Sequence, residues 1–264
     1  MSKKNMPIGV FDSGIGGLTV LEKLIELFPH ENFVYVADQG HCPYGTKTAE
    51  QVGERVAKVT KFLTEEHNAK AVVIACNTAS LRIDYAKKVT FVPVISVIEP
   101  TCQKAVSLTK NGKIIVLATI ATINSGTYQR LIEQQGKTPV PLACSEFVDF
   151  VEHHDLTDPL GQQIVTEKLN QIKDCGADTL IHGCTHFSLL QPQMENVLGK
   201  INYVACGLPT GNRLAEILAQ NNLLSTSTES GSVQIFTTGS VDNALATMKW
   251  FTAPHSPVVH TDID

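Results

Sequence analysis

The sequence predicts an α/β fold of two pseudo-symmetric domains, each with a mostly parallel sheet, and an active site in the cleft between them. Three observations lead to this prediction. Short apolar runs rich in β-branched residues alternate with helical patterns along the whole chain, as expected of βαβ units. A length of 264 residues accommodates two domains with separate cores. Finally, stretches from the two halves of the chain match each other.

The individual elements follow from the hydrophobic pattern. Apolar runs predict strands at residues 7–11, 32–38, 70–76, 92–96, 113–119, 178–184, 202–206 and 233–238. Apolar residues at helical spacing predict helices between these strands, as at Leu18, Leu21, Leu24, Ile25 and Phe28, and at Val52, Val56, Val59 and Phe62. We expect the tail after Pro254 to be loose.

The internal match indicates a duplicated α/β unit. Residues 69–78, AKAVVIACNT, align with residues 177–186, ADTLIHGCTH, with alanine and cysteine matching at both ends of the run. IGVFD at 8–12 aligns with IVLAT at 115–119 at almost the same offset. We therefore predict a first domain of residues 1–98 plus the returning segment 210–264, and a second domain of residues 99–209.

Composition and charge favour a compact soluble protein of a reducing cytoplasm that does not bind nucleic acid. The formal charge is only −5 and the sequence has no Lys/Arg run, so nucleic acid is not an expected partner. No stretch is long and apolar enough to span a membrane, and the apolar run near the N-terminus is too short for a signal peptide. The seven cysteines include no C-x-x-C pair, as expected in a reducing compartment.

Two of the cysteines end predicted strands at matching positions. Cys76 is followed by Asn77-Thr78 and Cys184 by Thr185-His186, residues that can start a helix and so favour a thiolate. A single such cysteine is more often a buried core residue, but a matched pair favours function. If the two halves face each other, one thiol can remove a proton from a carbon and the other can return one to the opposite face, which inverts the carbon.

Ionisable side chains near the two thiols are expected to tune them. The candidates are Asp12, Asp38, Glu152 and His186. His186 is the strongest of them because it lies two residues beyond Cys184. The cysteines and histidines lack the spacing of a zinc site, so no metal is predicted.

Two further motifs suggest ligand contacts. FDSGIGG at 11–17 leads from a strand through a glycine-rich turn into a helix, a geometry that can bind an anion, although Asp12 or Ser13 capping the helix is an equal alternative. The segment Asp38 to Gly45 reads as a turn that directs Tyr44 and the Gly45 amide toward a ligand, with a plain loop as the alternative.

These motifs together resemble the bacterial glutamate racemases of the cofactor-independent Asp/Glu racemase family. The resemblance covers essentially the whole chain and rests on the following stretches: GVFDSGIGGLTVL (9–21), the PYG motif ending at Gly45, ACNTAS (75–80), PVISVIEP (93–100), ATIATINSGTY (118–128), LACSEFVDFVE (142–152) and TLIHGCTHFSLL (179–190).

The resemblance implies a homodimeric enzyme with glutamate bound between the domains, no cofactor and no metal, which supplies D-glutamate for peptidoglycan. It makes Cys76 and Cys184 the proton donors and acceptors, supported by Asp12, His186, Asp38 and Glu152. It implies that substrate is bound by Asp12, Ser13, Tyr44, Gly45, Asn77, Thr78, Thr119, Thr122, Ser125, Thr185 and His186.

The chain departs from the family pattern away from the cysteines. The departures are His41, Ser145-Glu146, Phe187-Ser188 and Ala205-Cys206. They bear on the rate, the subunit interface and regulation. The alternatives to a glutamate racemase are a racemase of aspartate or another small acidic amino acid, an inactive ligand-binding homologue, and a thiol-redox protein, which the absence of C-x-x-C disfavours.

Overall fold

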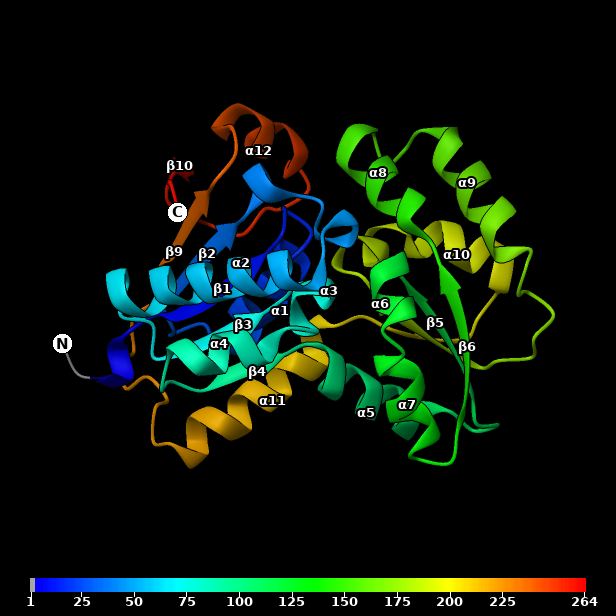
Figure 1. The fold of residues 1–264 in the computed structure, drawn as a ribbon, viewed down its shortest axis with the longest axis horizontal. Helices are drawn as coiled ribbons and strands as arrows, with labels where there is room; N and C mark the ends of the chain where they lie inside the picture. Colours follow the sequence, from blue (N-terminus) through cyan, green and yellow to red (C-terminus); the bar gives the residue numbers. More distant parts are fainter. Residues whose placement is uncertain (1–2) are drawn as a thin grey trace. The chain divides into compact units, whose positions relative to one another are not determined.

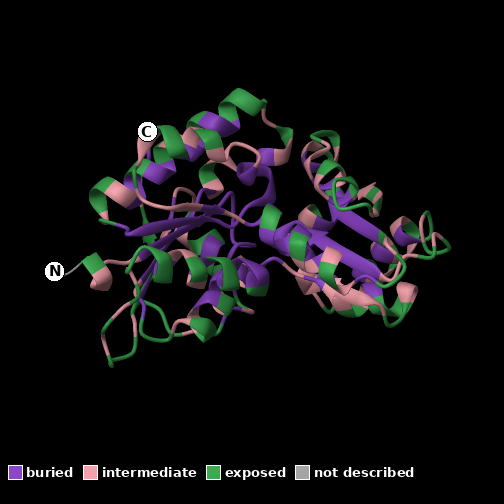
Figure 2. Ribbon diagram, turned by 90° about the horizontal axis from the view of Figure 1, so that it is seen from below, coloured by how far each residue is buried: buried purple, intermediate pink, exposed green. Residues whose placement is uncertain are grey.

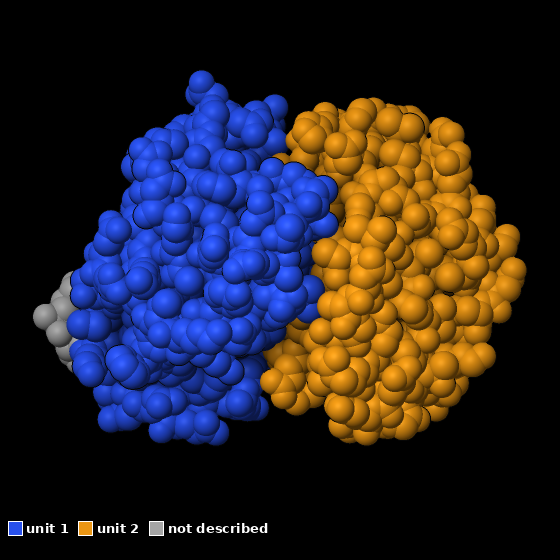
Figure 3. Space-filling model, viewed as in Figure 1, with its two compact units in different colours: residues 1–97, 207–264 blue, residues 98–206 orange. Residues whose placement is uncertain are grey.

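A computed structural model of the chain describes residues 3–264 (Figure 1). The chain forms two compact units (Figure 3). Unit 1 comprises the described residues up to Val97 and the segment Gly207–Asp264, and unit 2 comprises Ile98–Cys206. The return to unit 1 comes three residues earlier than the sequence suggested, because the helix that starts at Gly207 belongs wholly to unit 1.

Unit 1 is built on a six-stranded sheet in the order β10-β9-β2-β1-β3-β4, with every pair parallel. Its strands are β1 (Ile8–Asp12), β2 (Phe33–Ala37), β3 (Ala71–Ile74), β4 (Val94–Ser96), β9 (Val233–Thr237) and β10 (Val259–His260). All residues of β1, β2 and β3 are buried (Figure 2). Burial on both faces explains why these strands read as continuous apolar runs.

Helices cover both faces of this sheet. They are α1 (Leu18–Leu27), α2 (Ala49–Lys61), α3 (Asn77–Ser80), α4 (Ile83–Val89), α11 (Gly207–Gln220) and α12 (Val241–Thr247). Unit 1 also contains the 3-10 helices η1 (Lys3–Asn5), η2 (Gln39–His41) and η3 (Tyr44–Thr46), and the π-helical turn η4 (Phe62–Glu66) that continues α2. Helix α2 begins at a capping box between Thr48 and Gln51. Its apolar side packs on Phe11, Val34 and Val72 of the sheet.

The tail of the chain is docked on unit 1, so the prediction of a loose tail was wrong. Strand β10 pairs with β9, and the Thr261 amide donates to the Thr237 carbonyl at 2.9 Å. The Ile263 side chain is buried in the same core cluster as Val52 and Val56. The pairing is only two residues long, and such a short strand leaves no readable alternation in the sequence.

Unit 2 contains a four-stranded parallel sheet in the order β6-β5-β7-β8. Its strands are β5 (Lys113–Ala118), β6 (Thr138–Ala143), β7 (Thr179–Gly183) and β8 (Asn202–Val204). The sequence prediction missed β6, which contains Pro139 and Pro141. Prolines spaced two apart are tolerated there because β6 is an edge strand, where alternate N–H positions face away from the sheet.

The helices of unit 2 complete its core. They are α5 (Ile98–Leu108), α6 (Ile120–Asn124), α7 (Thr127–Glu133), α8 (Ser145–His153), α9 (Pro159–Leu169) and α10 (Gln191–Leu198), with the 3-10 helix η5 (Thr185–Leu190). Phe147 and Phe150 of α8 pack with Phe187 and Leu180 in one buried cluster. Across residues 3–264, no helix combines the length and apolar character needed to cross a membrane.

The two units share a four-strand core with the same connectivity. The order β2-β1-β3-β4 in unit 1 corresponds to β6-β5-β7-β8 in unit 2. Cys76 follows the third strand of the first set and Cys184 follows the third strand of the second. The predicted α/β class, the parallel sheets and the repeated unit are confirmed.

Candidate functional site

The carboxyl edge of the unit 1 sheet gathers three of the predicted site residues. Asp12 ends β1, Asp38 follows β2, and Cys76 follows β3. The register pairs Asp12 with Ala37 and Phe11 with Ile74, so these three strands end at the same level. Open parallel sheets bind ligands at this edge.

Cys76 is held at the start of α3. Its sulfur accepts a hydrogen bond from the Ala79 amide at 3.4 Å, and its Sγ lies 3.7 Å from the Ser13 hydroxyl. Ser13 in turn donates to Asp12 Oδ1 at 3.3 Å. Cys76 is 6% exposed. Ser13 therefore connects the thiol to a carboxylate, while the amide stabilises negative charge on the sulfur.

The glycine-rich turn is shaped by its contacts with β1 and β2. The Gly14 amide donates to Asp12 Oδ1 at 3.0 Å, and the Tyr35 hydroxyl donates to the Gly14 carbonyl at 2.7 Å. A Cβ at Gly17 would lie 2.5 Å from the Cβ of Asp12, so the close approach requires glycine. Helix α1 has Gly17 as its N-cap residue. Asp12 and Ser13 do not cap that helix.

Asp38 is fully buried and lies at the centre of a hydrogen-bonded cluster. Arg55 donates Nε–H to its Oδ2 at 3.0 Å and Nη2–H to its Oδ1 at 2.8 Å. The Tyr44 hydroxyl donates to Oδ2 at 2.5 Å, and the Thr238 hydroxyl donates to Oδ1 at 2.8 Å. Burial alone would raise the pKa of Asp38, but these hydrogen bonds and the Arg55 charge lower it below its ordinary value.

In unit 2, Cys184 faces a histidine–glutamate pair. Cys184 Sγ lies 3.6 Å from His186 Nδ1, and His186 Nε2 lies 2.6 Å from Glu152 Oε1. Glu152 comes from α8, and His186 comes from the first turn of η5. Cys184 is 8% exposed. The structure therefore brings together three residues that the sequence named as candidates.

The surroundings of His186 favour its protonated, positively charged form. Burial alone would lower its pKa, but the hydrogen bonds and charges of Cys184 and Glu152 raise it well above 6.5. The protonated ring lies 3.6 Å from the sulfur. A positive charge at this distance stabilises a thiolate, as in enzymes with reactive cysteines. The two thiols thus have different neighbours, a serine and an aspartate for Cys76, and a histidine and a glutamate for Cys184.

The predicted threonine and serine contacts lie on one turn after β5. Thr119 caps α6 by accepting from the Thr122 amide at 3.4 Å, and its hydroxyl donates to the Thr122 hydroxyl at 3.0 Å. The Ser125 hydroxyl donates to the Thr122 carbonyl at 2.6 Å. Ala118 pairs with Gly183, so this turn begins at the same sheet edge as Cys184.

Sequence reasoning missed Arg55, although a signal was present. Arg55 lies between Val52 and Val56 on the apolar side of α2 and is buried. A lone arginine in an apolar stripe needs a buried partner, and here that partner is Asp38. Thr238 and Ile263, which contact Asp38 and Arg55, could not be found from local patterns because they lie about 200 residues away along the chain.

His182 on β7 is a buried histidine outside this network. Neither ring nitrogen has a hydrogen-bond partner among the described residues. Burial lowers its pKa from 6.5 to about 4, so the folded protein keeps the ring neutral. The unfolded chain takes up the proton first as the pH falls, and stability is lost between pH 6.5 and about 4.

Replacing His182 with leucine is expected to make the free energy of unfolding fall less steeply as the pH is lowered. The loss of unfolding free energy between pH 7 and pH 4 should be smaller by about 3 kcal/mol than in the parent chain. Urea unfolding at a series of pH values measures the effect, with the exposed His255→Leu as a control that follows the parent. If the His182→Leu variant and the parent chain lose the same free energy of unfolding between pH 7 and pH 4, the acid-dependent loss does not come from His182.

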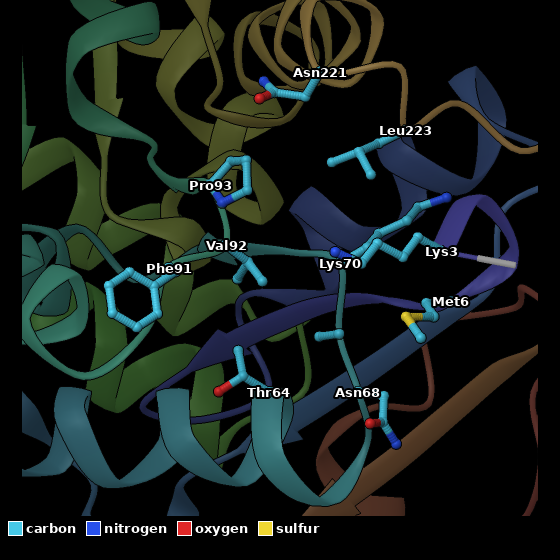
Figure 4. A pocket seen from close by; sticks show the side chains of 11 residues that line it. Lys3, Met6, Thr64, Asn68, Lys70, Phe91, Val92, Pro93, Asn221 and Leu223 are labelled. Atoms are coloured by element: carbon cyan, nitrogen blue, oxygen red, sulfur yellow. The ribbon is translucent and has the colours of Figure 1, made fainter. Parts of the chain in front are cut away.

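A hollow of about 390 Å³ lies at the other edge of the unit 1 sheet (Figure 4). It is lined by residues that precede the strands, including Met6 before β1, Lys70 before β3 and Pro93 before β4. The Lys70 ammonium there is paired with the buried Glu31 carboxylate. This is the amino edge of the sheet, opposite Cys76, so we place the candidate site at Cys76 and not in this hollow.

Within residues 3–264, no group of three or more His, Cys, Asp or Glu side chains is placed to hold a metal ion.

The sequence pattern of the Asp/Glu/Hydantoin racemase family matches residues 8–207. The chain belongs to this family. Racemases are isomerases.

Several members of the family are similar to this protein over nearly its whole chain. A glutamate racemase of Levilactobacillus brevis is 38% identical over 266 residues, which cover 98% of this chain and 96% of that protein. The crystal structure of a glutamate racemase from Bacillus anthracis has a TM-score of 0.92 at 32% identity, with 98% of each chain covered. A Francisella tularensis glutamate racemase in complex with D-glutamate has a TM-score of 0.90 at 28% identity, with 99% of each chain covered.

Proposed function

We propose that the chain is a glutamate racemase that interconverts L- and D-glutamate by proton transfer between two cysteines, without a cofactor. The observation that carries the proposal is the matched placement of Cys76 and Cys184 after equivalent strands β3 and β7. Each thiol has its own polar neighbours. The similarity to glutamate racemases over nearly the whole chain supports glutamate as the substrate.

In the proposed reaction, the thiolate of one cysteine removes the α-proton of glutamate, and the thiol of the other donates a proton to the opposite face of the same carbon. The product is the mirror image of the substrate, and the two sulfurs have exchanged protonation states. His186 and Glu152 hold the charge that develops at Cys184. The Ala79 amide serves Cys76 in the same way by donating to its sulfur, and Ser13 Oγ accepts from the Cys76 thiol.

The substrate is held by the polar residues that surround the two thiols. We assign its amine and carboxylates to Asp12, Ser13, Tyr44, Gly45, Asn77, Thr78, Thr119, Thr122, Ser125, Thr185 and His186. The D-glutamate product would serve peptidoglycan synthesis. The family resemblance also implies a homodimer in the cytoplasm, and both stay predictions. Light scattering of the purified protein can test the homodimer.

Circular dichroism of the purified protein with L-glutamate or L-aspartate tests the proposal. We expect the signal of L-glutamate to decay to zero with no added cofactor and with a chelator present, and that of L-aspartate to persist. Decay with aspartate alone would assign the chain to aspartate racemisation. Activity that requires added pyridoxal phosphate or a metal ion would contradict the mechanism.

A further inference from the structure

Tyr44 is positioned by a buried carboxylate rather than by solvent or by its own loop. The side chain is buried, and its hydroxyl donates to Asp38 Oδ2 at 2.5 Å. Tyr44 belongs to the same core cluster as Cys76, and η3 packs against α3, the helix that starts after this thiol. The direction of the Tyr44-Gly45 segment beside Cys76 therefore depends on where Asp38 is held.

Asp38 is in turn held by the fork of Arg55. Two N–H groups of the guanidinium bind the two carboxylate oxygens at 3.0 and 2.8 Å. Both side chains are buried, with 8% of the arginine side chain and none of the aspartate side chain exposed. A buried carboxylate needs such pairing, because an unpaired charge in the interior is strongly destabilising. The planar fork also fixes the carboxylate in rotation, which a lysine could not do.

The third arm of the guanidinium is bound by the tail of the chain. Arg55 Nη1–H donates to the Ile263 carbonyl at 2.5 Å. We call residues 258–263 the tail strap. The strap is fastened by the pairing of β10 with β9, and the Ile263 side chain packs in the core cluster that contains Tyr44 and Cys76. One continuous set of contacts therefore runs from the strap through Arg55 and Asp38 to Tyr44.

We propose that Arg55 and the tail strap are positioning residues for the Tyr44-Gly45 segment, so that docking of the strap sets the affinity for the amino-acid substrate. This inference rests on the proposed function, in which Tyr44 and Gly45 contact glutamate. Release of the Ile263 carbonyl leaves one guanidinium arm without its partner and lets Arg55, and with it Asp38 and Tyr44, leave the fixed geometry. By linkage, bound glutamate stabilises the docked strap.

Two shortened chains that differ only near Ile263 test the role of the strap. In a chain ending at Thr261, which keeps β10, we expect KM for both enantiomers to rise about tenfold, with kcat changed by less than about threefold. In a chain ending at Ile263, the oxygen that faces Arg55 is retained as a terminal carboxylate, so KM should be unchanged. Circular dichroism of both chains with L- and D-glutamate supplies the kinetics.

Chemical rescue tests Arg55 itself. Arg55→Ala should raise KM by about tenfold or more, and guanidinium chloride at low millimolar concentration should restore it by occupying the space between Asp38 and the Ile263 carbonyl. Urea at the same concentration should restore nothing. Arg213→Ala, which removes an exposed arginine of α11 in unit 1, is the matched control and should show neither the loss nor the response.

Amide hydrogen exchange gives a readout that does not depend on turnover. The amides of residues 44–47 should exchange faster in Arg55→Ala and in the chain ending at Thr261, while those of β3 stay protected. Unchanged KM and unchanged exchange in both variants would overturn the strap assignment while leaving glutamate racemisation intact. A parent chain without glutamate racemase activity would instead refute the proposed function, and the exchange data alone would then decide whether the strap holds the loop.

Discussion

Replacement of either Cys76 or Cys184 by alanine is expected to abolish racemisation of L- and D-glutamate, with kcat reduced by at least about three orders of magnitude. In the proposed reaction, each direction uses one thiol to remove a proton and the other to return one, so neither direction survives the loss of one sulfur. Circular dichroism with each enantiomer measures the loss. Cys175→Ala, which removes a half-buried thiol of unit 2, should leave both rates unchanged.

The serine variants distinguish the faces of the substrate. In deuterated water, Cys76→Ser should exchange the α-hydrogen of one enantiomer of glutamate and Cys184→Ser that of the other, because each retains a single thiol facing one side of the carbon. Proton NMR of the recovered L- and D-glutamate follows the exchange. If both variants favour the same enantiomer, or if both lose exchange with each enantiomer equally, the assignment of the thiols to opposite faces is wrong.

The sequence was sufficient for the central strands and the residues that follow them. Strands β1, β3, β5 and β7 are buried on both faces, so their apolar runs are visible without any knowledge of their neighbours. Since the carboxyl ends of parallel strands form the ligand edge, the polar residue after each run is a candidate by position alone. That reasoning found the two thiols and Asp12.

Features that depend on distant partners were not accessible in this way. Strand β6 carries two prolines and is recognisable only from its place at the sheet edge. The tail docks through two paired residues and two buried side chains, those of Val258 and Ile263. Arg55 has an odd position on an apolar helix face, but its contact with Ile263 spans 208 residues of chain. The spacing of apolar residues shows which side of a helix or strand is buried. It does not show which distant residue that side contacts, because tertiary packing determines those contacts.

The pair around Cys184 illustrates both cases. His186 lies two residues from the thiol and was the strongest candidate from sequence alone. Glu152 lies 34 residues from His186, and only the packing of α8 beside η5 brings its carboxylate within 2.6 Å of Nε2. The structure also shows that the two thiols have different hydrogen-bonding neighbours, which the matched sequence motifs did not indicate.

His186→Gln is expected to lower kcat/KM by about two orders of magnitude, equally for both enantiomers. The reduction is equal because L- and D-glutamate have the same free energy in water, which fixes the ratio of the two kcat/KM values. The loss follows from removal of the positive ring beside Cys184. The separate kcat values are free to change by different factors, and full progress curves from each enantiomer measure them.

Glu152→Gln tests how that positive charge is maintained. The Glu152 carboxylate is one of the groups that raise the pKa of His186 well above 6.5, so its neutralisation lowers this pKa and the ring loses its proton at a lower pH. If the proposed reaction needs the imidazolium, activity is lost as the pH rises through the His186 pKa. We therefore expect the basic limb of the kcat/KM profile to move to lower pH. Glu146→Gln is the matched control, because Glu146 lies on the same helix but pairs with Lys168 at 2.7 Å, and its profile should follow the parent. A basic limb that stays in place in Glu152→Gln would show that Glu152 orients the ring without setting its charge, since orientation alone changes the height of the profile and not its position on the pH axis.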